Sequence, residues 1–133
     1  MESRKILSGI AGLILFGQFA LAHHSFTAEY DSAKVRQFTG TVTKVEWTNP
    51  HARFYVDVKD EKGAVANWNF ELGSPILLRK LGWKPDSLKI GDQVTVEGYL
   101  AKDGSHMANA RNVTLSDGRR VFAGSSADIK PGR

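Results

Sequence analysis

The chain has 133 residues, a formal net charge of +4 at pH 7 and no cysteine. This length allows one compact domain with a modest core. Without cysteine there can be no disulfide and no thiol for lipid attachment, so folding must depend on burial alone. The charges are spread along the chain without a block of like sign, which excludes a basic tail of the kind that coats nucleic acid.

The first 22 residues have the three-part pattern of a secretory signal peptide. Arg4 and Lys5 form a basic start, residues 6–17 are apolar with one exception, and Ala20-Leu21-Ala22 is a small-x-small cleavage signal. A retained membrane anchor is the alternative, but the apolar run is shorter than the roughly 20 residues that span a bilayer. We expect cleavage after Ala22 and a periplasmic or secreted protein without a membrane segment. Export also argues against a nucleic-acid partner.

Alternating patterns follow in the expected mature protein. Residues 52–58 and 66–72 place apolar side chains at every second position, which is typical of half-buried strands. The polar turn 60–63 contains a glycine and joins them as an antiparallel hairpin. An earlier run, 38–47, changes parity, and a β-bulge near Thr43-Lys44 would explain the change. These residues predict three strands, the first sharply bent.

The period then changes to that of a helix. Ser74 is a suitable N-cap before Pro75, and Gly82 is a stop signal, so a short helix is expected over residues 75–81. Two further strands are expected at 93–101 and 107–115. The helix has an apolar side formed by Ile76, Leu77, Leu78 and Leu81.

The order of three strands, one helix and two strands predicts an all-β fold with one short helix. It is typical of an OB-fold-like five-stranded Greek-key barrel, although other small β-barrels and sandwiches stay open. We expect a mature N-terminal segment at 23–37, the barrel domain at 38–122 with a brief sixth strand at 120–122, and a disordered tail at 123–133. OB-folds bind ligands across strands two and three and in the loops joining strands one to two and four to five.

Cleavage after Ala22 would make His23 the first residue of the mature chain. A terminal histidine offers a metal its imidazole together with the free α-amine, and His24 or His51 could supply a third nitrogen. Copper(II) suits such a tetragonal nitrogen site best and heads the divalent affinity order. The amine must lose its proton to bind, so affinity should fall with acidity. The candidate metal ligands are therefore His23, His24 and His51, with copper(II) as the candidate cofactor.

The loop that carries His51 is stiffened by Pro50. Two plainer interpretations stay open: a mature terminus commonly frays in solvent, and Asn49-Pro50 can be an ordinary turn in which His51 caps a backbone carbonyl.

The motifs of the chain resemble those of one known family. It is a family of small exported bacterial proteins classed as a domain of unknown function, with HHSF and W-x-NPH as recurring motifs. The resemblance implies an exported single-domain protein with an OB-like barrel, and it implies no activity; His106 lies outside the pattern. It rests on His23-His24-Ser25-Phe26, Tyr30-Asp31, Gly40-Thr41-Val42, Val45 to His51, Ser74-Pro75, Gly82-Trp83 and Gly91-Asp92.

A non-metal binding module is the alternative function. Arg53, Tyr55 and Asn69, with His106 in the loop between strands four and five, could line a polar groove for an oligosaccharide, a small ligand or a partner protein. The plainer interpretation is that these strand residues, and Glu71 with them, form an ordinary solvated face.

Aromatic stacking gives the groove little support. Phe54, Trp68 and Phe70 share parity with aliphatic residues, so we assign them to the core rather than to a stacking platform. No nucleophile motif, zinc-binding HExxH or phosphate-binding glycine loop is present, and Glu71 has no visible carboxylate partner. The sequence therefore favours a binding protein over an enzyme.

Overall fold

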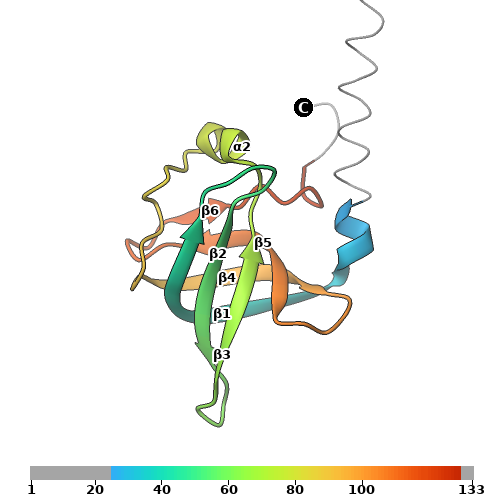
Figure 1. Ribbon diagram of the computed structural model, residues 1–133, viewed down its shortest axis with the longest axis vertical. Coiled ribbons are helices and arrows are strands. Elements are labelled where there is room, and N and C mark those ends of the chain that lie inside the picture. The colour runs from blue at the N-terminus through green and yellow to red at the C-terminus, as the bar shows by residue number, and fades with distance from the viewer. Residues whose placement is uncertain (1–24, 130–133) are drawn as a thin grey trace, which may run out of the picture.

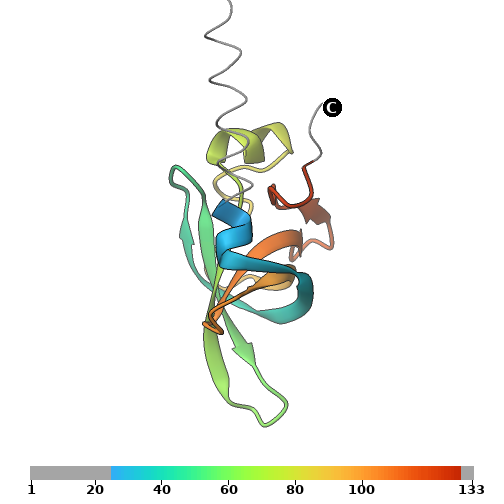
Figure 2. The same cartoon turned by 90° about the vertical axis from the view of Figure 1, so that its right-hand side faces the viewer.

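The structure is a computed structural model that describes residues 25–129 (Figure 1, and turned by 90° in Figure 2). The predicted signal peptide, His23, His24 and residues 130–133 lie outside the described residues. Within 25–129 no helix is long and apolar enough to cross a membrane. The elements are β1 (Tyr30–Glu46), β2 (Arg53–Lys59), β3 (Val65–Glu71), α2 (Pro75–Lys80), β4 (Gln93–Ala101), β5 (Met107–Thr114) and β6 (Arg120–Phe122), with residues 25–29 also helical.

Strand pairing closes the sheet into a ring. β1 pairs antiparallel with both β2 and β4, β2 pairs with β3, and β4 pairs with β5. β3 then joins β5 in parallel, and β6 extends the sheet beside β5. Five strands closed in this order, with a helix between β3 and β4, form the Greek-key barrel of an OB-fold. The predicted fold class is confirmed.

β1 serves two partners because it bends. Its earlier part pairs with β4 and its later part with β2, and the register shifts between Val42 and Lys44, where the sequence predicts a bulge. The strand begins at Tyr30, however, and not at Phe38. Residues 30–37 are therefore part of the barrel rather than a separate N-terminal segment. Their side chains are mostly exposed, so no apolar alternation indicates a strand there.

The hairpin and helix follow the predicted pattern closely. β2 and β3 pair in one unbroken register, and Ser74 Oγ accepts a hydrogen bond from the backbone N–H of Leu77 at 3.2 Å. The predicted apolar side of α2 is only partly correct. Leu78 is fully buried, whereas Ile76 is 66% and Leu81 37% exposed. A helix this short contacts the barrel through little more than one turn.

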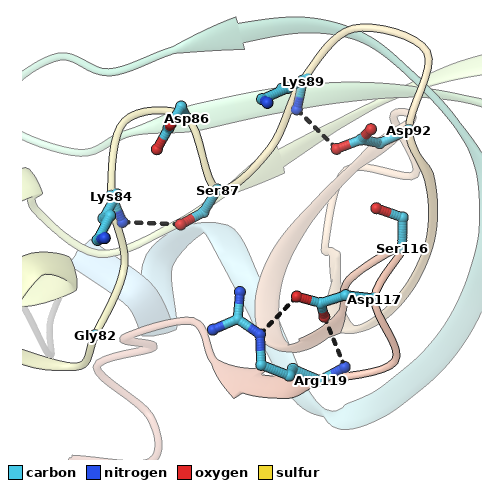
Figure 3. A pocket seen from close by; sticks show the side chains of 9 residues that line it. All are labelled: Gly82, Lys84, Asp86, Ser87, Lys89, Asp92, Ser116, Asp117 and Arg119. Carbon is cyan, nitrogen blue, oxygen red and sulfur yellow. Dashed lines mark hydrogen bonds and ion pairs between the residues drawn. The ribbon is translucent and has the colours of Figure 1, made fainter.

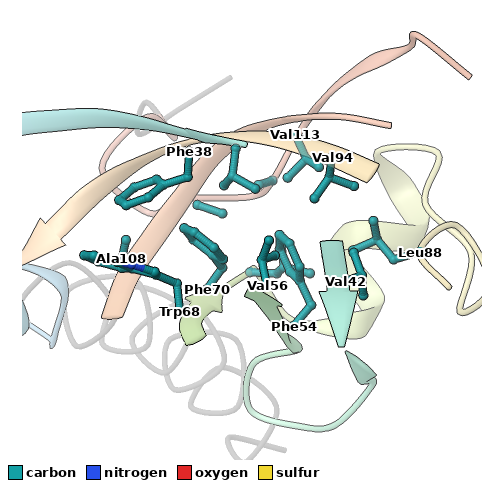
Figure 4. Close-up of a cluster of buried hydrophobic side chains, with 14 of the residues drawn as sticks. Phe38, Val42, Phe54, Val56, Trp68, Phe70, Leu88, Val94, Ala108 and Val113 are labelled. Atoms are coloured by element: carbon teal, nitrogen blue, oxygen red, sulfur yellow. The ribbon is translucent and has the colours of Figure 1, made fainter. Parts of the chain in front are cut away.

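The core fills the interior of the barrel (Figure 4). Phe54 and Phe70 are fully buried, and Trp68 is nearly so, as their parity predicts. Phe70 stacks on Phe54 with ring centroids 5.3 Å apart and meets Phe38 edge-on at 5.1 Å. Such aromatic pairs add to the stabilisation from buried apolar area.

A second apolar cluster joins the two ends of the described chain to the barrel. Phe26 packs between Tyr30 and Tyr99, with ring centroids 5.6 and 5.3 Å away. Ala127, in the segment where the sequence predicts a disordered tail, packs against this cluster. The chain after β6 is thus anchored to the barrel as far as residue 129.

The nature of the contacts made by residues 123–129 explains why the hydrophobic pattern of the sequence does not predict that this segment is ordered. Ala123 and Ser125 are buried, the backbone N–H of Gly73 donates to the carbonyl of Ala123 at 2.9 Å, and Tyr99 Oη donates to Asp128 Oδ1 at 2.9 Å. Small residues and backbone groups make most of these contacts, and neither carries a hydrophobic pattern.

The hydrogen bond between Tyr99 and Asp128 predicts a loss of stability at alkaline pH. Burial, together with the bond to Asp128, raises the pKa of Tyr99 from 10.0 to about 12. The unfolded chain therefore loses this proton first, and the free energy of unfolding should fall as the pH rises from 10 towards 12. Denaturant unfolding across this range should show a shallower fall for Tyr99→Phe. An equal slope in both proteins would contradict the assignment.

Candidate functional site

A buried carboxylate lies where β3 ends. Glu71 pairs with Arg53 of β2 on one side and with Asn109 of β5 on the other. Glu71 is only 8% exposed, so the interpretation from the sequence that it lies on a solvated face is wrong. Alternation assigns it to the outer face correctly, but Tyr30 and the helical residues before it cover that face here.

Three donors converge on this carboxylate. Tyr30 Oη donates to Oε2 at 3.1 Å, and Arg53 Nη2 donates to the same oxygen at 2.7 Å. Asn109 Nδ2 donates to Oε1 at 3.2 Å. Arg53 balances the charge, which a buried carboxylate requires. Burial, and then the negative charge of Glu71, raises the pKa of Tyr30, so its hydroxyl keeps the proton that it donates.

His51 lies beside the same carboxylate. Its Nδ1 is 3.6 Å from Oε1 of Glu71, and its side chain is 37% exposed. The loop around it is held by the next residue: the backbone N–H of Ala52 donates to Gly73 O at 3.0 Å, and Ala52 O accepts from Leu72 N–H at 2.9 Å. The Asn49–Pro50 peptide bond is cis. His51 is thus presented by an anchored backbone, with part of its ring open to solvent.

A small cavity of about 30 Å³, with both polar and apolar walls, opens at this point. Such a volume holds about one water molecule or a similarly small group. Asn109 Oδ1 is buried and has no hydrogen-bond partner within residues 25–129. The cavity is lined by Ser25, Phe26, His51, Glu71, Leu72, Gly73, Asn109, Gly124 and Ser126. Its wall therefore includes an acceptor that suits an incoming donor.

The described residues alone do not form a metal site. No group of three histidine, cysteine, aspartate or glutamate side chains within residues 25–129 could hold an ion. His51 and Glu71 are two such groups, so further ligands would have to come from elsewhere. Ser25 lines the cavity and directly follows His24 in the sequence.

The proposed groove residues are only partly brought together. Arg53 Nη1 donates to Asn69 Oδ1 at 3.4 Å, and Tyr55 is the cross-strand partner of Asn69. The guanidinium of Arg53 is already paired with Glu71. His106 instead stacks on Trp68, with ring centroids 4.9 Å apart, on the opposite side of β3 from Asn69. His106 thus does not line a common groove with the other three.

A larger hollow of about 330 Å³ lies apart from this site, beside the loop before β4 and the turn between β5 and β6 (Figure 3). Its polar groups mostly bond to one another. Lys84 N–H donates to Ser87 Oγ at 2.8 Å, and Arg119 pairs with Asp117 at 2.7 Å. Three basic and three acidic residues line it, so its lining has no excess of either charge.

Sequence reasoning named His51 and Arg53 but missed Tyr30 and Asn109. Arg53 faces Glu71 across the predicted hairpin, whereas only the closure of the barrel brings Tyr30 and Asn109 to the same carboxylate. A lone acidic residue at the end of an apolar strand, flanked by buried positions, is the one local signal that could have indicated burial.

Comparisons with known proteins identify a family and a solved structure that are similar to this chain. The model of a family of unknown function, DUF6152, matches residues 12–110. No curated protein sequence matches the chain. Among solved structures, the chain is similar to a mitochondrial single-stranded DNA-binding protein from S. cerevisiae, Rim1. The identity is 12%, the TM-score is 0.48, and 62% of this chain and 92% of that chain are covered. The fold assignment rests on the strand pairing, not on this similarity.

Proposed function

Because the chain belongs to the DUF6152 family of unknown function, its role has to be argued from its own residues, and we propose that it is an exported copper(II)-binding protein. In this proposal, cleavage after Ala22 makes His23 the terminal residue. Its α-amine and imidazole bind one copper(II) ion, and His51 supplies a further nitrogen.

The observation that carries the proposal is the position of Ser25. Ser25 lines the same small cavity as His51 and Glu71, and only His24 separates it from His23. The unpartnered Asn109 Oδ1 leaves this cavity an acceptor for an incoming N–H group.

The available donors favour copper(II) over a hard cation. Magnesium and calcium need several oxygen ligands, and the carboxylate of Glu71 is already shared by Tyr30 and Arg53. A positive guanidinium beside the carboxylate also repels a cation bound directly to it. An amine and two imidazoles form instead a nitrogen set with the tetragonal preference of copper(II).

The test begins with the mature terminus. Intact-mass measurement of the secreted protein should show a chain that starts at His23. That form should bind one equivalent of copper(II), and a Gly-Ser-Gly extension before His23 should weaken the binding at least about tenfold, or 1.4 kcal/mol. Three residues are added because a shorter extension would place His24 or His23 at position three of the chain. A histidine at that position forms a different copper site. Copper titration followed by calorimetry and visible absorption measures both forms.

Two histidine variants serve as a matched pair in the same titration. His51→Ala should weaken copper binding by a similar factor, whereas His106→Ala should not, since His106 stacks on Trp68 away from the cavity. Equal affinity in the extended and mature forms would overturn the terminal-amine site. Secretion of a chain that still contains residues before His23 would overturn the proposal altogether.

A further inference from the structure

Glu71 has bonding capacity beyond the three donors described above. An ionised carboxylate offers about four acceptor positions. Oε2 accepts from Tyr30 and Arg53, and Oε1 accepts from Asn109. Oε1 can therefore accept one more donor, and it is the oxygen that lies 3.6 Å from Nδ1 of His51. Since the imidazole is partly exposed, a small rotation can bring this pair into hydrogen-bond range.

The carboxylate is held in place on its other sides. Arg53 and Tyr30 fix Oε2, and Asn109 fixes Oε1, so the group has little freedom to turn away from His51. The backbone bonds of Ala52 fix the loop that carries His51. A rigid acceptor beside one ring nitrogen selects the tautomer in which that nitrogen carries the proton.

We propose that Glu71 is a positioning residue for His51. It accepts the Nδ1–H of His51, which leaves the Nε2 lone pair as the copper-binding nitrogen. This inference rests on the proposed function, because it assigns a role within the same site. Metal-binding histidines commonly donate their second ring nitrogen to a carboxylate in this way, and the bond fixes the ring and raises the basicity of the ligating nitrogen. Arg53, Tyr30 and Asn109 then support the site without binding the metal.

The test reads the tautomer without metal. Heteronuclear NMR of the metal-free mature protein, at mildly alkaline pH where a free imidazole is neutral, reports which ring nitrogen of His51 carries the proton. His51→Ala assigns the signals. We expect the Nδ1–H form to predominate, although a histidine in water favours Nε2–H. Predominance of Nε2–H would overturn the positioning role, whether or not copper binds.

Glu71→Gln gives the second readout. Its amide presents one acceptor instead of two, so His51 should revert towards Nε2–H, and copper affinity should fall about 10- to 100-fold. Glu61→Gln, in the exposed turn between β2 and β3, makes the same charge change and should alter neither quantity. Unchanged copper affinity in a folded Glu71→Gln protein would contradict the inference. If this variant does not fold, the tautomer of His51 in the wild-type protein still tests the positioning role of Glu71. Failure of the proposed function is detected separately, as an absence of copper binding in the titration of the mature form.

Discussion

Glu71→Ala is expected to lower the free energy of unfolding by about 3 kcal/mol, which corresponds to a fall of roughly 10–20 °C in the melting temperature of a domain this size. The substitution leaves the guanidinium of Arg53 without its partner and removes the acceptor for Tyr30 and Asn109. Breaking a fully buried ion pair costs about 3–5 kcal/mol. The lower end applies because the Arg53 side chain is 28% exposed and water can solvate part of its charge.

Glu97→Ala is the matched control for this prediction. Glu97 pairs with Arg111 at 3.5 Å and Arg120 at 3.3 Å; its own side chain is 30% exposed, but its partners are 40% and 61% exposed. Exposed pairs contribute about 0–1 kcal/mol. Urea unfolding of the two variants should therefore separate them by about 2 kcal/mol or more. Similar losses for both would show that Glu71 does not anchor this end of the barrel.

Gly40→Ala is expected to be at least as damaging, at about 3–5 kcal/mol, the upper end for single substitutions. Gly40 lies in β1 where that strand pairs with β2 and β4 at once. A Cβ atom there would stand 2.1 Å from the backbone oxygen of Asp57 and 2.8 Å from Cγ1 of Val56. Backbone cannot rotate aside as a side chain can, so β1 and β2 would have to separate.

Gly98 offers a graded comparison. A Cβ atom at Gly98 would meet the backbone oxygen of Asn109 at 3.0 Å, a contact that a small shift relieves. Gly98→Ala should therefore cost clearly less than Gly40→Ala in the same denaturation experiment. If Gly40→Ala were as stable as the wild type, the close approach of β1 and β2 would be wrong.

The strands and the fold follow from local patterns. Alternation in 52–58 and 66–72, the glycine-bearing turn and the Ser74 cap each act over a few residues, and each predicts the element that forms. The bulge in β1 is also local: plain alternation would place Val45 on the face opposite Val42, and the bulge returns it to the same face, where it pairs with Phe54. Residues 30–37 and 123–129 depend on contacts with residues far along the chain. The local hydrophobic pattern therefore does not predict their structure.

In the candidate site, too, local sequence features predict some residues, and contacts between distant residues determine the others. His51 was predicted because loop, proline and motif are neighbours in sequence. Glu71 was assigned to solvent because only the parallel pairing with β5 and the covering residues near Phe26 bury it. The groove hypothesis grouped His106 with the strand residues by its loop position alone, and the loop after β4 places its ring over Trp68. Tertiary contacts decide the surroundings of both residues.

Pulsed electron paramagnetic resonance of the copper(II)-loaded mature protein tests most directly whether the terminal histidine and His51 share one ion. The method detects imidazole nitrogens coupled to copper. The wild type should show two imidazoles, and His51→Ala should lose one of them while His106→Ala keeps both. Identical spectra for the wild type and His51→Ala would contradict a site that joins the terminus to the loop.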